Sequence, residues 1–313
     1  MASASDYLKN LITTIDAVIH GKQDQTSLIL AVWLASGHVL LEDVPGTGKT
    51  LLAKTISKVM GLDFGRVQFT PDLLPSDILG SLILDSKTNE LKLRKGPIFT
   101  CLFLGDEINR ATPRTQSALL EAMAEQNVTI DGEGHALDEL FFVMATQNPI
   151  EQHGTFPLPE AQLDRFMIKL SLGYPDYESE MKMIQERFLE NPLDKITSLS
   201  SKNEIIQIKE LVNHVKIDKS VLKYVMNLIQ ATRNHPDIAT GASPRSTLAL
   251  VQLSKSLSLL KGAGFVSPST IYDIFPKVMN HRIKLMPDSK FSGKKIASIT
   301  ESILKSVKAP ILK

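Results

Sequence analysis

The chain has 313 residues, 43% of them hydrophobic and 22% charged, which is the balance of a globular protein with room for two domains of ordinary size. Thirty-five basic and 34 acidic residues leave a net charge of +1, so nothing in the totals requires a polyanionic partner, and nucleic acid is not expected. The single cysteine, Cys101, excludes an intramolecular disulfide, and because the chain has neither an apolar run of membrane-spanning length nor a secretion signal, we expect a cytoplasmic protein.

Strands and helices alternate through the first half of the chain. Apolar residues recur at helical intervals over 7–19, 25–35, 49–60 and 113–125. Short apolar runs between them predict strands at 38–41, 66–69, 98–104, 140–145 and 166–170. This alternation predicts an α/β fold in which helices cover both faces of a parallel sheet.

Two hairpins interrupt the alternation. In the segment 70–95, the stretches 78–84 and 90–93 can pair across a turn. A smaller hairpin is expected within 127–139. Both are expected as insertions that leave the sheet itself unchanged.

The composition changes at Gly173, which opens the sequence Gly-Tyr-Pro. Beyond it helical patterns predominate and no strand is expected; the predicted helices are 177–190, 203–212, 219–234, 244–261 and 268–284. We therefore expect two domains, an α/β core over 1–173 and a helical domain over 174–313.

The most informative segment is 40–50, with the sequence LLEDVPGTGKT. An apolar strand leads into a glycine-containing loop, and the helix that follows would aim its positive end at that loop. In such loops the lysine reaches the β- and γ-phosphates, and the threonine hydroxyl coordinates Mg²⁺. The expected contacts to a nucleotide are Pro45, Gly46, Thr47, Gly48, Lys49, Thr50 and Leu51.

One position departs from the usual phosphate-loop pattern, because Asp43 stands where the first glycine is expected. A carboxylate beside phosphates is unfavourable, so we expect the Asp43 side chain to lie outside the phosphate-binding turn. If it lay inside, nucleotide affinity would be low. The plain alternative, a strand-turn-helix corner without a ligand, is rare for Gly-Lys-Thr after an apolar strand.

Two acidic residues, Asp106 and Glu107, follow the apolar run 98–104. Phosphoryl transfer needs a metal ion and a group that orients or deprotonates the attacking water. Asp106 would hold Mg²⁺, mostly through water, and Glu107 would act on the attacking water. Such a pair can also be a solvated turn, but beside a phosphate loop it indicates hydrolysis.

Three further polar residues lie where a triphosphate could be sensed. Asn148 follows the strand 140–145, at the edge where parallel sheets bind their ligands. Arg165 precedes an edge strand and can point out of its own subunit, and Arg245 opens a helix of the second domain. Either arginine could be an ordinary surface residue, but planar cations of this kind stabilise charge on a transferred phosphoryl group.

Five motifs in this order and spacing resemble those of the MoxR family of AAA+ ATPases: GDEINRA at 105–111, RTQSALLEAMAE at 114–125, MATQNP at 144–149, LPEAQLDRF at 158–166 and GASPR at 241–245. The resemblance covers about 19–285. It implies an AAA+ core with strand order 5-1-4-3-2, a helical lid, and a ring, usually hexameric, with ATP bound between subunits.

The resemblance also implies roles for individual residues. These roles are Walker A for Lys49 and Thr50, Walker B for Asp106 and Glu107, sensor 1 for Asn148, the arginine finger acting on a neighbour's nucleotide for Arg165, and sensor 2 for Arg245. The hairpin at 78–93 resembles the helix-2 insert, and 127–139 the pre-sensor-1 insertion. Ile19, His20 and Gly21 occupy a segment that commonly flanks adenine, although a helix-ending turn explains them nearly as well.

By this resemblance the chain would hydrolyse ATP with Mg²⁺ and remodel, assemble or mature partner proteins, in a chaperone-like way or by inserting metal cofactors. Such partners often carry a von Willebrand factor A domain.

Three alternatives stay open. They are a nucleic-acid motor that uses the basic residues Lys87, Lys92, Arg94 and Lys95, a small-molecule kinase, which Arg165 and Glu107 disfavour, and a switch that binds ATP without turnover.

Overall fold

The computed structural model describes residues 2–149, 154–187 and 192–311. Its central sheet has five strands in the spatial order β2 (Phe64–Gln68), β5 (Leu102–Asp106), β8 (Phe142–Gln147), β1 (Val39–Glu42) and β9 (Ile168–Leu170). All neighbouring strands in it are parallel. Counted along the chain these are strands 2-3-4-1-5, so the predicted α/β fold and the order 5-1-4-3-2, read from the other edge, are confirmed.

The sheet separates two hydrophobic cores, because successive side chains of a strand point to opposite faces. In β1, Val39 and Leu41 belong to one core and Leu40 to the other. The helices that cover the first core are α1 (Ala2–Asp16), α2 (Gln23–Leu34) and α3 (Lys49–Met60), and α5 (Pro113–Glu125) covers the second. The helices predicted at 49–60 and 113–125 have the expected bounds.

The strand predicted at 98–104 begins later, at Leu102. Ile98 and Thr100 form a turn instead, in which the Ile98 N–H donates to the Ile78 carbonyl oxygen and the Thr100 N–H to the Ile98 carbonyl oxygen. Ile98 is nevertheless fully buried. The apolar run therefore predicted correctly that these residues are buried, but it was wrong in predicting that they form a strand.

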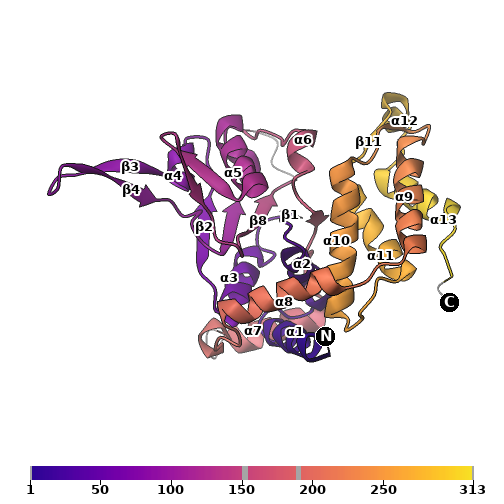
Figure 1. Cartoon of the computed structure of the whole chain (residues 1–313), viewed down its shortest axis with the longest axis horizontal. Coiled ribbons are helices and arrows are strands. Elements are labelled where there is room, and N and C mark those ends of the chain that lie inside the picture. The colour runs from indigo at the N-terminus through magenta and orange to yellow at the C-terminus, as the bar shows by residue number, and fades with distance from the viewer. Residues whose placement is uncertain (1, 150–153, 188–191, 312–313) are drawn as a thin grey trace.

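Both predicted hairpins are present. Helix α4 (Pro75–Leu79) leads into β3 (Gly80–Asp85) and β4 (Glu90–Lys95), a hairpin that projects far from the body of the molecule (Figure 1). The smaller hairpin pairs β6 (Asn127–Ile130) with β7 (Glu133–Ala136). The short helix η1 (Ile108–Arg110) follows β5, and the short helix α6 (Glu160–Leu163) precedes β9.

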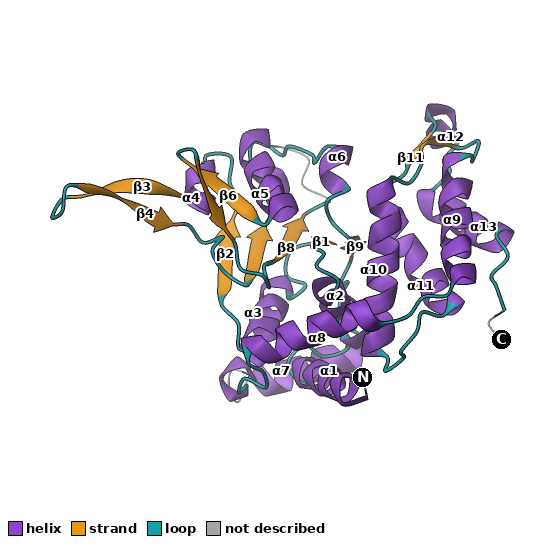
Figure 2. Cartoon of the chain, viewed as in Figure 1, coloured by secondary structure: helices purple, strands orange, loops and turns teal. Residues whose placement is uncertain are grey.

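Helices predominate after β9, as Figure 2 shows by colour. They are α7 (Tyr177–Arg187), η2 (Pro192–Lys195), α8 (Lys202–His214), α9 (Lys219–Arg233), α10 (Pro244–Leu260), α11 (Pro268–Met279), α12 (Pro287–Phe291) and α13 (Ile296–Ser306). The end of the helix predicted at 177–190 lies outside the described residues. In the described part of the chain, no helix has the length and apolarity needed to cross a membrane.

Two expectations for this region are corrected. A small antiparallel sheet of β10 (Ile238–Thr240) and β11 (Lys284–Leu285) lies where helices alone were expected. The helix predicted to run to residue 284 ends at Met279, because the chain turns there to bring His281 and Arg282 against the core. The domain boundary near residue 173 stays a prediction.

Candidate nucleotide-binding site

The loop between β1 and α3 has the backbone shape that an anion requires. Gly46 and Gly48 adopt left-handed conformations, with φ of 86° and 85°. A Cβ added at either position would meet nothing within 4 Å, so backbone conformation and not crowding selects glycine there. Gly48 is the N-cap of α3, which leaves the first backbone N–H groups of the helix available to an anion.

Lys49 lies across this loop. Its Nζ donates hydrogen bonds to the carbonyl oxygens of Asp43, at 3.1 Å, and of Val44, at 2.9 Å. Burial lowers the pKa of Lys49, while the charges of Asp43, Asp106 and Glu107 act in the opposite direction. The ammonium group is thus held at the loop by neutral carbonyl acceptors. A negatively charged phosphate oxygen can take their place as its hydrogen-bond acceptor.

Asp43 has its carboxylate turned away from the loop. Oδ1 accepts from Ser171 Oγ at 2.6 Å and from the Gly173 N–H at 3.0 Å, and Oδ2 accepts from the Leu172 N–H at 2.7 Å. The carboxylate is thus hydrogen-bonded to the segment that directly follows β9. The expectation that it lies outside the phosphate-binding turn agrees with this geometry.

The acidic pair stands at the carboxyl end of β5. Thr146 Oγ1 donates to Asp106 Oδ1 at 2.7 Å and accepts from the Glu107 N–H at 2.9 Å, so one hydroxyl orients both residues. Glu107 has a left-handed backbone conformation, with φ of 58°, which is uncommon for a residue with a side chain. Strain of this kind concentrates at functional sites, where neighbouring contacts maintain it.

Three residues that the sequence did not single out hold the two carboxylates. Arg66 Nη2 pairs with Asp106 Oδ2 at 2.9 Å. Gln68 Nε2 donates to Glu107 Oε2 at 2.8 Å, and Arg110 Nη1 pairs with the same oxygen at 2.9 Å. Arg66 and Gln68 alternate along β2, the neighbour of β5, and this alternation was the available signal.

The donor set at Asp106 fits Mg²⁺. Thr50 Oγ1 lies 3.4 Å from Asp106 Oδ2, so a hydroxyl and a carboxylate oxygen face the same point. Hard oxygen donors in small number suit Mg²⁺, which keeps several of its waters. Arg66 shares that carboxylate oxygen and would have to yield part of it to a cation.

The loop residues, the acidic pair and its two partners on β2 line one pocket of about 410 Å³ at the carboxyl ends of β1, β5 and β8. Its walls are Asp43, Pro45, Gly46, Thr47, Gly48, Lys49, Thr50, Leu51, Arg66, Gln68, Asp106, Glu107, Thr146, Gln147 and Asn148. The structure therefore brings together the predicted loop residues, both acids and Asn148. We call this cavity the loop pocket.

Arg165 and Arg245 lie elsewhere. Both line a second pocket of about 240 Å³, together with Asp164, Arg282 and Leu248. Neither arginine lines the loop pocket. The structure thus brings the two predicted arginines together, one from the core and one from the lid, but apart from Lys49; we call this second cavity the arginine pocket.

The residues expected near adenine do not line the loop pocket either. Gly21, with φ of 69°, packs closely on the start of α7, where an added Cβ would lie 2.5 Å from Ser179 Oγ. Beside it, Lys22 Nζ donates to the Tyr174 carbonyl oxygen at 2.8 Å. An adenine contact by Ile19 or Gly21 stays a prediction.

Comparison with known families agrees with this geometry. A model of the ATPase family associated with various cellular activities (AAA) matches residues 38–168. A model of the AAA lid domain matches residues 230–303. The first match spans the loop pocket and Arg165, and the second spans Arg245.

Individual relatives cover nearly the whole chain. A protein named Chaperone MoxR1, from Mycobacterium tuberculosis, is 36% identical over 99% of this chain and 84% of its own length. The uncharacterised protein YeaC of Bacillus subtilis is 44% identical, with 97% and 95% of the two chains covered. The crystal structure of a proposed ATPase from Cytophaga hutchinsonii has a TM-score of 0.92 at 38% identity and covers 99% and 96%. The chain belongs to the MoxR family of AAA+ ATPases.

Proposed function

We propose that this chain hydrolyses ATP in the presence of Mg²⁺ at a site that two subunits share, and that it uses the reaction to remodel or mature a partner protein. The observation that carries the proposal is the separation of two residue sets. Lys49, Asp106 and Glu107 line the loop pocket, whereas Arg165 and Arg245 line the arginine pocket. A site that needs both sets is complete when a second copy presents its arginine pocket to this loop pocket.

Such a contact joins two different surfaces of the same chain. Head-to-tail contacts of this kind close into a ring when the rotation per subunit allows it. A hexamer is the size that the family resemblance implies, and we propose it here. Both arginines would then act on the nucleotide of the same neighbour.

The chemistry follows from the groups in the loop pocket. Lys49 and the N-terminus of α3 bind phosphate oxygens, and Thr50 and Asp106 would hold the metal. When bound, Mg²⁺ neutralises charge on the phosphates. Glu107 orients the attacking water, Asn148 contacts it or the γ-phosphate, and the neighbour's arginines stabilise the charge that develops in the transition state.

The cellular role rests on family membership. One relative is named a chaperone, and we propose a chaperone-like role for this chain as well. Maturation of a metal-containing partner, recruitment through a von Willebrand factor A domain and a cytoplasmic location belong to the same proposal. Loss of the γ-phosphate would release contacts between subunits together, which can drive such work.

The decisive variant is Glu107→Gln. We expect turnover to fall by about 100-fold or more while ATP binding persists, because the amide cannot act as a base but leaves the loop unchanged. Phosphate release and fluorescent nucleotide titration measure the two effects, with the exposed Glu133→Gln as the control. Equal turnover in Glu107→Gln would contradict the role of Glu107, and pull-down with this variant in ATP would identify the partner.

A further inference from the structure

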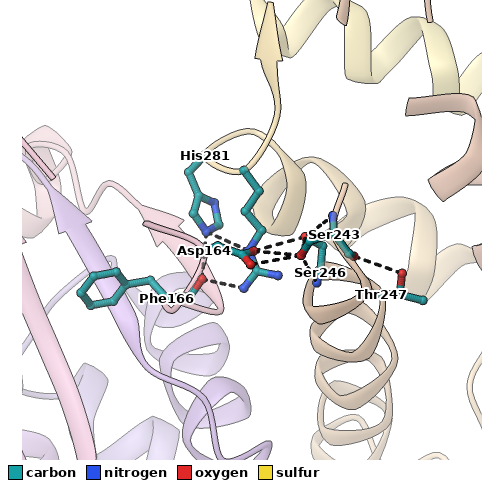
Figure 3. Close-up of polar contacts among 7 residues, drawn as sticks. Asp164, Phe166, Ser243, Ser246, Thr247 and His281 are labelled. Atoms are coloured by element: carbon teal, nitrogen blue, oxygen red, sulfur yellow. Dashed lines mark hydrogen bonds and ion pairs between the residues drawn. The ribbon is translucent and has the colours of Figure 1, made fainter. Parts of the chain in front are cut away.

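A cluster of polar side chains joins the core to the lid beside the arginine pocket (Figure 3). From the core it contains Asp164, the residue before Arg165, and the Phe166 carbonyl, directly after it. From the lid it contains Ser243 and Ser246, at the start of α10, and His281 and Arg282, after α11. We call these six residues the junction.

Asp164 contacts the first turn of α10 through two serine hydroxyls. Its carboxylate accepts hydrogen bonds from Ser243 Oγ, at 3.1 and 3.3 Å, and from Ser246 Oγ at 3.3 Å. Ser243 is also the N-cap residue, whose Oγ accepts from the Ser246 N–H. A carboxylate at this position is further favoured by the positive end of the helix.

Arg282 is the buried cation of the junction, with its side chain only 2% exposed. Nη2 donates to the Phe166 carbonyl oxygen at 2.7 Å, and Nε faces both Asp164 Oδ1, at 3.5 Å, and His281 Nε2, at 3.3 Å. Burial lowers the pKa of Arg282 to about 10, so it stays charged at neutral pH.

His281 contacts the same carbonyl oxygen as Arg282. Burial lowers the pKa of His281 to about 3, so its ring is neutral and carries one proton. Nε2 lies 2.9 Å from the Phe166 carbonyl oxygen, an acceptor, and must keep that proton to donate it. Nε2 also lies 3.3 Å from Arg282 Nε, which forms an ion pair with Asp164 Oδ1 at 3.5 Å, so His281 and Arg282 both hold the Phe166 carbonyl oxygen.

The residues on both sides of Arg165 are thus bonded to the lid. Arg245 stands in the first turn of α10, whose N-cap residue is bonded to Asp164. A buried charged cluster of this kind is seldom the most stable way to fill an interface, and apolar replacements are often as stable. What such a cluster can supply instead is one fixed geometry between two parts of a protein.

We propose that the junction is a positioning device: Arg282 and Asp164, with the two serines, set the spacing of Arg165 and Arg245 so that both reach one nucleotide of the neighbouring subunit. This inference rests on the proposed shared site. It assigns to Arg282 and Asp164 no contact with the nucleotide. Their effect passes through the two arginines that they hold.

Arg282→Met, which keeps an unbranched apolar side chain as far as the ε position but removes the charge and the donors, tests the junction. We expect kcat to fall about 10- to 100-fold, the loss that follows from small misplacements of catalytic groups, while the nucleotide Kd of the loop pocket changes less than about twofold. Arg282→Lys should be intermediate, because a point charge replaces the planar fork. Lys284→Met is the matched control, since it breaks another core–lid ion pair, with Glu160, that is solvent-exposed.

Mixing separates this role from a general structural one. Arg282→Met subunits keep an intact loop pocket, and Lys49→Ala subunits keep intact arginines, so mixtures of the two should recover activity. If Arg282 acted through its own loop pocket, no mixture would recover. Failure to recover in every mixture would overturn the positioning role of the junction. A wild-type kcat in Arg282→Met, under conditions in which Arg165→Ala lowers kcat, would overturn it as well.

A distance measurement tests the junction without hydrolysis. Spin labels on cysteines introduced at Glu121 of α5 and Lys277 of α11, both exposed, report the core–lid distance, and the native Cys101 is buried. We expect a broader distance distribution in Arg282→Met than in the wild type or in Lys284→Met; equal widths would overturn the proposal. If Arg282→Met does not fold, the Ser243→Ala/Ser246→Ala variant carries the same tests. Absence of hydrolysis in the wild type would refute the proposed function instead.

Discussion

Asp43 shows how a residue can break a motif without breaking the site. Its carboxylate accepts three hydrogen bonds from residues 171–173, which follow β9. The position therefore links the phosphate loop to the start of the helical region. Glycine would satisfy the usual pattern there but would remove that link.

We predict that Asp43→Gly destabilises the protein without improving nucleotide binding. The Leu172 N–H would lose its acceptor in a buried setting, so the free energy of unfolding should fall by about 1–3 kcal/mol. Asp43→Asn keeps one oxygen acceptor, so its free energy of unfolding should lie between those of the wild type and Asp43→Gly. Urea unfolding and ADP titration test this, and a tenfold gain in ADP affinity at unchanged stability would contradict it.

His38 makes the stability of the core depend on pH. Its Nδ1 accepts from the Val143 N–H at 3.0 Å and its Nε2 donates to the Met123 carbonyl oxygen at 3.1 Å, so the neutral ring bridges β8 and α5. Burial, with a smaller effect of Lys209, lowers the pKa of His38 to about 4. The unfolded state therefore binds more protons between pH 6.5 and 4, and this stabilisation is lost as the pH falls through that window.

We predict that this histidine alone removes about 2 kcal/mol of unfolding free energy between pH 7.5 and 5. His38→Gln should lower stability at pH 7.5 and flatten the pH dependence by that amount, as denaturant unfolding at several pH values would reveal. His214→Gln, at an exposed position, is the control. If the unfolding free energies of wild type and His38→Gln changed with pH in parallel, His38 would have no part in the pH dependence of stability.

The projecting hairpin of β3 and β4 carries the basic residues on which the alternative of a nucleic-acid motor depends. Leu84 and Leu91 pair across it and are 60% and 65% exposed. Of its basic residues, Lys92 pairs with Asp85 at 2.6 Å and Lys95 lies 4.9 Å from the centre of the Phe99 ring. Exposed leucines and partly compensated charges suit a protein surface better than a phosphate backbone.

We therefore predict that DNA does not stimulate ATP hydrolysis, even at low salt. Turnover of the wild type and of a Lys87→Ala/Arg94→Ala variant should be equal with and without DNA. The measurement is phosphate release over a series of salt concentrations. Stimulation that fades as salt rises, and that the double variant lacks, would favour the motor.

At the scale of the whole molecule, the division between the loop pocket and the arginine pocket predicts complementation. Arg165→Ala and Lys49→Ala should each be nearly inactive, because one lacks the finger and the other the phosphate ligand. Mixed subunits should recover part of the wild-type phosphate release, since some interfaces combine an intact loop pocket with an intact arginine. Mixtures as inactive as the separate variants would argue against a shared site.

The sequence by itself determined the elements whose signals are local. The bounds of α3 follow from Gly48 and Gly61 at its ends, and the start of α5 follows from its N-cap Thr112 and from Pro113. The loop residues, Asp106, Glu107 and Asn148 could be placed at one edge of the sheet because parallel strands end together.

Only the tertiary structure decided which of these residues share a pocket. Lys49 and Arg245 are both sequence motifs, but the packing of α10 on α2 and of α11 on β9 directs Arg245 to the side of Arg165. The pairing of Asp164 with Arg282 carries no local signal, since the two residues are 118 positions apart in the sequence. Contacts between distant segments depend on how whole elements pack, and no short stretch of sequence encodes that arrangement.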